Sequence, residues 1–424
     1  MAVRQETEEA GQAARRAAAR ILGAVLVERM FLDAAVLEMG VTLTGPERAR
    51  ARTIADGVLR KLAALDALID PHLKPDTPVR IRHVLRIAAW EMLVDGVAAH
   101  AAVDGAVRSA KATRKVSQLA GLTNAVARKL EAGDLDPSPA TLPGYLRKPL
   151  VAAYSGKVVS AMEAVHAVVP PVDLSLRDRN EADSLAADLG AALLPTGSLR
   201  LDRPGQISAL PGYADGAWWV QDAAAAVPVR LLGDPKGARV LDLCAAPGGK
   251  TMQLAALGAD VTAVDASSDR LVRLTENLAR TKLAATVTCA DVLDLDLDPF
   301  DIVVLDAPCS ATGTLRRHPD LPFVKKDLAL APILVLQERL VTKAAALVRP
   351  SGHLLYCVCS LLPSEGGAQV HRLLSDGWTV DNQRPPGVDP DWFDKQGHLR
   401  LRPDYWSEIG GMDGFFATVL KKPG

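Results

Sequence analysis

After Lys236 the hydrophobic pattern changes to short apolar stretches that alternate with segments of helical period. Strands that alternate with helices build a parallel sheet covered by helices on both faces, because each parallel connection needs a long crossover. The pattern therefore predicts a doubly wound, Rossmann-like α/β domain. The expected strands are 239–244, 260–265, 285–289, 301–306 and 353–359, with a closing strand at 414–420, and helices are expected from about Lys250, Ser268, Asp327 and Ser364.

The first part of the chain has a different period. From Ala13 to about Leu130 apolar residues recur at helical spacing, and strand-like alternation is nearly absent. Breaks such as Gly45-Pro46 divide this stretch into short helices, which bury their apolar stripes only against each other. We expect an all-α bundle over 1–140, a linker with a small α+β segment over 141–235, and the α/β domain over 236–424, which makes a multidomain chain.

Composition and charge narrow the class of protein. Hydrophobic residues make up 49% and charged residues 23% of the chain, as in ordinary globular proteins, which excludes disorder and collagen-like order. The charged N-terminus lacks the apolar core of a signal peptide, and no apolar run approaches ~18 residues, so we expect a cytoplasmic protein without a membrane partner. The five cysteines lack the paired spacing of a zinc site, so we expect reduced thiols and no metal.

The net charge of −1 gives no global signal for a nucleic-acid partner, but basic residues are frequent in the helical region. A helix face that gathers several of them would suit RNA phosphates, and an ordinary solvated surface is an equal alternative. These residues are Arg15, Arg16, Arg20, Arg48, Arg50, Arg52, Arg108, Lys111, Arg114, Lys115, Arg128 and Lys129. Farther on, Trp218-Trp219 is interpreted as a core anchor in preference to a surface for base stacking.

A glycine loop, Cys244–Thr251, follows the first expected strand of the α/β domain. Its glycines let the backbone approach a ligand at the carboxyl edge of the sheet, and its spacing matches neither the dinucleotide nor the phosphate-loop motif. Asp265 and Asp291 follow the next two strands, where they suit the ribose hydroxyls and the adenine amine of a cofactor, or alternatively cap a helix. The candidate cofactor-binding residues are Cys244, Ala245, Ala246, Pro247, Gly248, Gly249, Lys250, Asp265, Asp291 and Asp306.

Two cysteines follow the last two parallel strands, Cys309 in DAPCS and Cys359 in CVCS. Carbon 5 of a cytosine attacks a methyl sulfonium only after a thiolate has added to carbon 6, so these thiols favour covalent methyl transfer to a pyrimidine. Asp306 is the candidate group for the proton or hydrogen bond at N3. A helix beginning near Pro363-Ser364 would lower the pKa of Cys359, which favours this thiol as nucleophile. Cys289 and Cys357 are interpreted as small buried apolar residues.

These residues resemble the motifs of the RsmB-type branch of the RNA (cytosine-5)-methyltransferases, a family that includes the eukaryotic nucleolar and NSUN-type enzymes. Asp242–Thr251 resembles the cofactor motif, Asp306–Ser310 the fourth motif and Val358–Ser360 the sixth. The resemblance implies S-adenosylmethionine as the cofactor, held by the residues given above. It also implies attack by Cys359, assistance from Cys309 in product release, and a role for Lys250 in organising the site. Val358 stands where the family usually has threonine.

The helical region resembles the NusB-like RNA-binding domain, most clearly at 85–93 and 122–126. This second resemblance implies 16S ribosomal RNA as the partner. Separately, we expect a monomer. Two alternatives remain open from the sequence. In the first, the same chemistry acts on a tRNA. In the second, the chain is an RNA-binding assembly factor whose methylase fold is vestigial.

Overall fold

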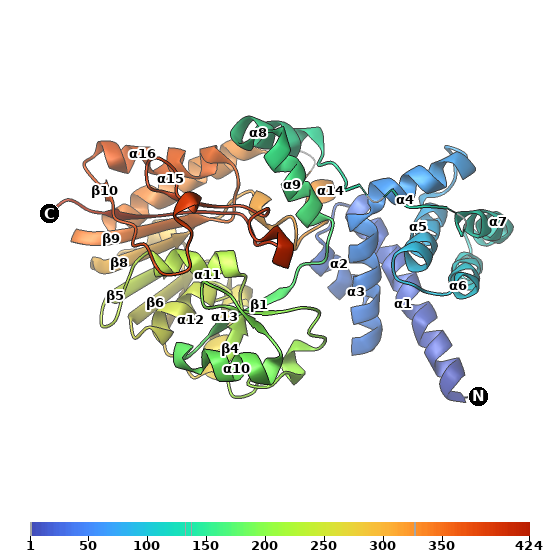
Figure 1. Ribbon diagram of the computed structural model, residues 1–424, viewed down its shortest axis with the longest axis horizontal. Coiled ribbons are helices and arrows are strands. Elements are labelled where there is room, and N and C mark those ends of the chain that lie inside the picture. The colour runs from blue at the N-terminus through green and yellow to red at the C-terminus, as the bar shows by residue number, and fades with distance from the viewer. Residues whose placement is uncertain (1, 132, 137, 326–327) are drawn as a thin grey trace. The chain divides into compact units, whose positions relative to one another are not determined.

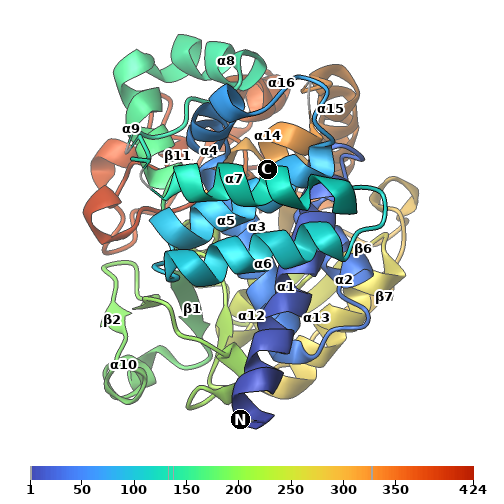
Figure 2. The same ribbon diagram turned by 90° about the vertical axis from the view of Figure 1, so that its right-hand side faces the viewer.

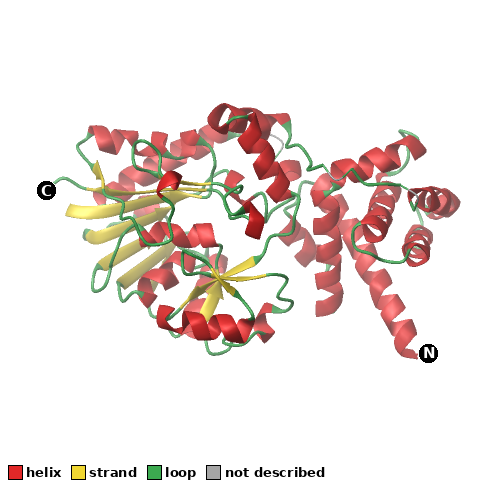
Figure 3. Ribbon diagram, in the orientation of Figure 1, coloured by secondary structure: helices red, strands yellow, loops and turns green. Residues whose placement is uncertain are grey.

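The computed structural model describes residues 2–131, 133–136, 138–325 and 328–424. The chain divides into two compact units that do not follow chain order. One comprises Met1–Lys148, Gly156–Val169 and Leu315–Asp327, and the other Pro149–Ser155, Pro170–Thr314 and Leu328–Gly424. Every strand of the described residues belongs to the second unit (Figure 3). The three predicted domain ranges stay a prediction, and the helix start expected at Asp327 lies outside the described residues.

The first unit is helical, and none of the described helices is long and apolar enough to cross a membrane. Figure 2 shows α6 and α7 side by side, and these two helices are in contact. α8 (Gly144–Tyr154) is divided between the units. The helices of this unit are α1 (Ala2–Leu26), α2 (Leu32–Met39), α3 (Gly45–Arg60), α4 (Leu62–Ile69), α5 (Val79–Leu93), α6 (Ala99–Lys111), α7 (Ala120–Leu130), α9 (Gly156–His166) and α14 (Leu321–Val324).

Local signals and close packing position the helices of this unit. α3 begins with a capping box, in which Thr44 and Glu47 satisfy each other's backbone N–H groups. Gly57 allows α3 to approach α5, because a Cβ atom there would lie 2.3 Å from the Trp90 ring. Segment 315–327 also packs here, and the backbone N–H of Leu32 donates to Asp320 at 2.8 Å. A piece of chain that follows the fourth strand of the large sheet thus completes the helical unit.

A small antiparallel sheet opens the second unit, with strand order β2-β3-β1-β4. Its elements are β1 (Val172–Leu176), α10 (Ala182–Leu189), β2 (Ala192–Leu193), β3 (Leu199–Leu201) and β4 (Trp218–Val220). Trp218 and Trp219 are buried, and both indole N–H groups donate hydrogen bonds within the protein. The interpretation of this pair as a core anchor is therefore confirmed, because neither ring is free to stack on a base.

The large sheet has the strand order β10-β12-β9-β8-β5-β6-β7, with β11 paired to β12. Strands β5 to β9 are parallel, and β12 is antiparallel to β9. Its strands are β5 (Arg239–Leu243), β6 (Asp260–Asp265), β7 (Thr286–Cys289), β8 (Phe300–Asp306), β9 (Val348–Val358), β10 (Thr379–Val380), β11 (Leu399–Leu401) and β12 (Phe415–Lys421). All six predicted strands are present within a few residues of their expected bounds.

Helices cover both faces of this sheet (Figure 1). The side chains of Leu241, Val303 and Leu354 pack under α15 and α16, whereas their chain neighbours Val240 and Ile302 pack against α11 and α12. The prediction of an all-α N-terminal region followed by a doubly wound α/β region is confirmed. The covering helices are α11 (Ala223–Arg230), α12 (Gly249–Ala256), α13 (Ser268–Thr281), α15 (Leu330–Ala346) and α16 (Gly367–Ser375).

Candidate active site

The two predicted thiols meet at the carboxyl edge of the large sheet. Strands β8 and β9 are paired in parallel up to Asp306 and Cys357, so the loops after them leave the sheet side by side. The Sγ atoms of Cys309 and Cys359 lie 3.4 Å apart, and both residues are half-buried. The two thiols therefore lie close enough to act on neighbouring atoms of one substrate.

Lys250 and Asp306 form an ion pair beside the thiols. Lys250, the second residue of α12, is buried, and its Nζ atom lies 2.7 Å from Oδ2 of the half-buried Asp306. Burial acts to lower the pKa of Lys250, but the carboxylate of Asp306 and other negative groups outweigh burial and raise this pKa, so the ammonium stays charged. The Cys357 thiol donates to the other oxygen of Asp306 at 3.6 Å. The pair thus places a fixed positive charge next to the cysteines.

Glu365 is a residue of this site that the sequence analysis missed. Its carboxylate is fully buried and accepts hydrogen bonds from the backbone N–H of Ser310 at 2.8 Å and from the Ser360 hydroxyl at 2.5 Å. The Ser310 hydroxyl and the Gln337 side chain also donate to it. Glu365 therefore joins the residues that directly follow the two thiols. The only available signal was a lone acid in the apolar stretch after Cys359.

The pKa of Cys359 differs from the sequence-based expectation. The segment Pro363–Glu365 forms a short 3₁₀ helix, and the α-helix begins only at Gly367. The hydrogen bond with Cys309, burial and nearby negative charge raise the pKa of Cys359 well above that of an ordinary thiol, although the Lys250 ammonium opposes them. The prediction that a helix N-terminus lowers this pKa is wrong, because the neighbouring thiol and burial dominate.

We expect Cys359 in the free protein to react with iodoacetamide slowly at pH 7 and faster as the pH rises beyond 9. A raised pKa leaves little thiolate at neutral pH, and below the pKa the thiolate fraction grows about tenfold per pH unit. Quantifying each alkylated peptide by mass spectrometry measures this rate. Cys289 serves as internal reference because it is exposed, so its interpretation as a buried apolar residue is wrong, whereas Cys357 is buried as expected.

The substitution Cys309→Ala is expected to accelerate alkylation of Cys359 at pH 7.5, because it removes the hydrogen bond that ranks first among the causes of the raised pKa. Each pKa unit recovered corresponds to about a tenfold faster reaction. An unchanged rate in this variant would show that the thiol pair does not control the pKa.

The glycine loop joins β5 to α12. Cys244 adopts a left-handed conformation with φ of 58°, and Gly248, with φ of 104°, lies where an added Cβ atom would be 3.0 Å from Leu274. The buried carboxyl of Asp242 accepts a hydrogen bond from Thr251 at 2.6 Å, and burial raises the pKa of Asp242 to about 7. These contacts fix the shape of the loop at the edge of the sheet.

Asp265 and Asp291 stand at the ends of neighbouring strands, as predicted. Asp265 accepts hydrogen bonds from the backbone N–H groups of Ala246 at 3.1 Å and Ser267 at 3.0 Å. The exposed Asp291 caps a short 3₁₀ helix through Leu293 at 2.9 Å. Asp265 is nearly buried and its Oδ2 atom also contacts Arg270, whereas Asp291 is exposed and uses only Oδ1, so the freer acceptor positions for a ligand are at Asp291.

An adenosine-containing cofactor fits this edge. The sheet order places the loop after β5 between Asp306 on one side and Asp265 and Asp291 on the other. Ribose hydroxyls and an adenine amine are hydrogen-bond donors, and carboxylates are acceptors. Arg270, which the sequence analysis missed, lies 3.4 Å from Asp265 and also donates to the carbonyl of Ala246. The cofactor-binding roles of the predicted residues stay predictions.

Comparison with known proteins relates both parts of the chain to described families. Residues 229–421 match the family model of the 16S rRNA methyltransferases RsmB/F, and residues 12–132 match the NusB family. The chain is 34% identical to ribosomal RNA small subunit methyltransferase B of Salmonella arizonae, with 89% of this chain and 91% of that protein covered. It is 33% identical to the protein of the same name from Serratia proteamaculans, with 88% and 94% covered.

Solved structures share the fold. PH0851 superposes with a TM-score of 0.74 at 21% identity, with 96% of this chain and 99% of that chain covered. NSun6 from Pyrococcus horikoshii superposes with a TM-score of 0.58 at 17% identity, with 66% and 98% covered. At these identities the structures establish only the fold. The full-length sequence relatives and the two matched family models together show that this chain belongs to the RsmB/F family of 16S rRNA methyltransferases.

Proposed function

We propose that the chain methylates carbon 5 of one cytosine in 16S ribosomal RNA, through a covalent bond between Cys359 and carbon 6 of the base. The single observation that carries this proposal is the pair of thiols 3.4 Å apart at the ends of two paired strands. Methylation at carbon 5 requires a nucleophile at carbon 6 and, afterwards, removal of the proton from carbon 5. Two adjacent thiols supply both functions.

S-adenosylmethionine, bound at the glycine loop, would supply the methyl group as an electrophilic sulfonium. The residues proposed to hold it are 244–250 together with Asp265, Asp291 and Asp306. The left-handed backbone conformations of Cys244 and Gly248 support the role of this loop, because they give it the tight turn that lets backbone groups meet a ligand.

Lys250 and Asp306 are proposed to act on the ring that Cys359 attacks. When sulfur adds to carbon 6, negative charge develops toward N3, which must receive a proton or a strong hydrogen bond. The ion pair stands beside the thiols, and its ammonium is held protonated by the carboxylate. The same positive charge favours the thiolate of Cys359, so one buried lysine assists both the nucleophile and the ring.

The substitution Cys309→Ala is expected to trap the RNA on the protein. Without the second thiol the proton on carbon 5 stays in place after methylation, so the bond between Cys359 and carbon 6 cannot break. We expect an adduct that survives denaturing gel electrophoresis when 16S RNA and S-adenosylmethionine are both present. The double variant Cys309→Ala/Cys359→Ala should form no adduct, and an adduct in the double variant would contradict attack by Cys359.

The target is tested by bisulfite sequencing of RNA from cells that lack this protein. Loss of one 5-methylcytosine from 16S RNA, restored by the wild-type chain and not by the Cys359→Ala variant, supports the proposal. Loss from a tRNA instead would move the same chemistry to another substrate. No change in any RNA, together with no binding of S-adenosylmethionine, would leave an assembly factor as the function.

A further inference from the structure

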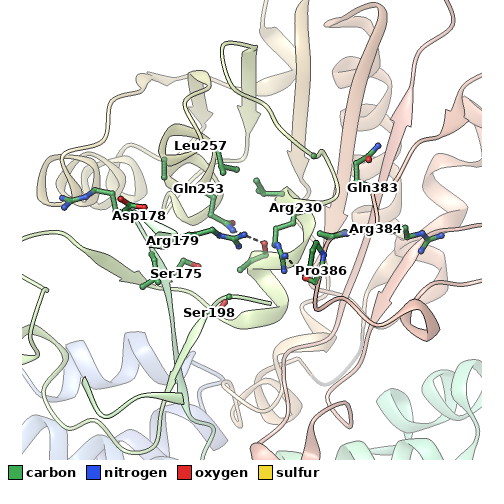
Figure 4. A pocket seen from close by; sticks show the side chains of 18 residues that line it. Ser175, Asp178, Arg179, Ser198, Arg230, Gln253, Leu257, Gln383, Arg384 and Pro386 are labelled. Atoms are coloured by element: carbon green, nitrogen blue, oxygen red, sulfur yellow. Dashed lines mark hydrogen bonds between the residues drawn. The ribbon is translucent and has the colours of Figure 1, made fainter. Parts of the chain in front are cut away.

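An arginine-lined pocket lies in the second unit, apart from the thiols. It has a volume of about 540 Å³, and its walls come from the end of β1 and the following turn, α11, the last residues of α12, and the loop 383–386 (Figure 4). α12 begins at the glycine loop, so loop and pocket lie at opposite ends of this helix. For a helix of this length the separation is about 12 Å, which a few nucleotides of one strand span.

Two guanidinium groups converge in this pocket. Arg230 donates to the carbonyl oxygen of Thr196 at 2.8 Å and to that of Pro386 at 2.7 Å. Arg179 donates to the same Thr196 carbonyl at 3.4 Å, and Figure 4 shows both side chains directed to this point. Arg384 also lines the pocket, whereas the guanidinium of Arg177 donates to the carbonyl oxygens of Asp215 and Thr281, outside the lining. The backbone carbonyls fix the direction of the two converging groups without neutralising their charge.

The charge of the pocket is not balanced by the protein. None of the ion pairs of the described residues involves Arg177, Arg179 or Arg230. The single carboxylate of the lining, Asp178, accepts hydrogen bonds from the backbone and side chain of Asn180. Burial lowers the pKa of Arg230 to about 10, with a further contribution from the charge of Arg179. Two like charges that repel each other favour an anion between them.

A buried hydroxyl group adds a neutral donor. Ser175 lines the pocket and is 7% exposed, and its Oγ atom has no hydrogen-bond partner among the described residues. Buried hydroxyl groups are nearly always hydrogen-bonded, so this atom lacks an acceptor, but it is covered by the pocket wall and a ligand reaches it only after a small movement of the side chain. Guanidinium forks and a hydroxyl are the donor set that binds phosphate.

We propose that this pocket binds a backbone phosphate of the RNA substrate, outside the site where the cytosine reacts. This inference rests on the proposed function, because the phosphate belongs to the RNA substrate of that reaction. The volume is in the range of sites that hold one nucleotide-sized group. A contact here holds the strand at a second point, and the register between the two points helps to select the cytosine that enters the thiol site.

The test measures RNA binding by the Arg179→Gln variant. Arg179 is preferred to Arg230 because its one bond to Thr196 is long, so its loss should leave the fold intact. We expect binding of a 16S RNA fragment to weaken about tenfold, and the slope of log affinity against log salt to fall by about 0.7, as for one phosphate contact. Arg339→Gln removes the same charge from an exposed position on α15 and should change neither quantity.

Further measurements separate the possible outcomes. Thermal unfolding and S-adenosylmethionine binding verify that each variant is folded. Arg230→Lys keeps the positive charge and tests whether the planar guanidinium group itself is needed. Equal RNA affinity of wild type and Arg179→Gln, with wild type active in methyl transfer, overturns this inference alone. Absence of RNA binding by the wild type overturns the proposed function as well. Calorimetric binding of pyrophosphate that Arg179→Gln abolishes, with RNA affinity unchanged, assigns the pocket to a free anion and overturns the RNA assignment.

Discussion

The substitution Cys359→Ala is expected to lower the rate of methyl transfer to 16S RNA by about 10⁴-fold or more, the range seen when an attacking nucleophile is removed from an enzyme. Without sulfur at this position carbon 5 of the cytosine stays a poor nucleophile, and no other described thiol reaches the same place. Cys309 lies 3.4 Å away but leaves a different strand. Transfer of a labelled methyl group in a single-turnover assay measures the loss.

Binding should survive this change. The Lys250–Asp306 ion pair and the glycine loop do not depend on the Cys359 side chain, so affinity for S-adenosylmethionine should stay within about twofold of wild type. Cys289→Ala removes an exposed thiol at the end of β7 and serves as the matched cysteine control. Full activity of Cys359→Ala together with an inactive Cys309→Ala would show that Cys309, and not Cys359, is the nucleophile.

The meeting of the two thiols could be predicted because it follows from local pattern and topology. Alternating apolar runs placed β8 and β9 within a few residues, and parallel strands end at one edge of a sheet. Two cysteines just beyond neighbouring strands are then close for most conformations of the loops. The same reasoning placed Asp265 and Asp291 beside the glycine loop.

Contacts between distant segments could not be predicted in this way. The pKa of Cys359 depends on a thiol fifty positions earlier and on burial, and neither effect is visible in the residues that follow it. The packing of 315–325 with the helical unit includes hydrogen bonds from Leu32 to Asp320 and from Tyr145 to Pro322, and apolar contacts. The arginine pocket is lined by five separate segments, the turn at 197–198 among them, and none of these segments indicates a site by itself.

The contacts of Glu365 are the clearest example of what the sequence pattern does not show. The substitution Glu365→Gln is expected to lower both stability and catalytic rate. The carboxylate accepts four hydrogen bonds, two from Ser310 and one each from Ser360 and Gln337. A glutamine of the same shape removes the negative charge from this fully buried site and places an NH₂ group beside the hydroxyls of Ser310 and Ser360, which must then turn to accept. Hydrogen bonds to a charged group are worth about 1.5–3 kcal/mol and neutral ones about 0.5–1.5 kcal/mol, so the free energy of unfolding should fall by about 2 kcal/mol.

The catalytic effect of Glu365→Gln is expected to appear in kcat and not in the KM for S-adenosylmethionine. The glutamate holds Ser310 and Ser360, the residues that directly follow Cys309 and Cys359, and it contacts no part of the glycine loop. Looser loops widen the gap between the thiols, and misplacement of about 1 Å costs roughly 100-fold in rate. Urea unfolding and initial rates measure both effects.

Glu338→Gln, an exposed change on α15, should stay within about 0.5 kcal/mol of wild type. If Glu365→Gln matches that control in stability and rate, the two loops are held by their own backbone contacts, and the carboxylate does not set the distance between the thiols.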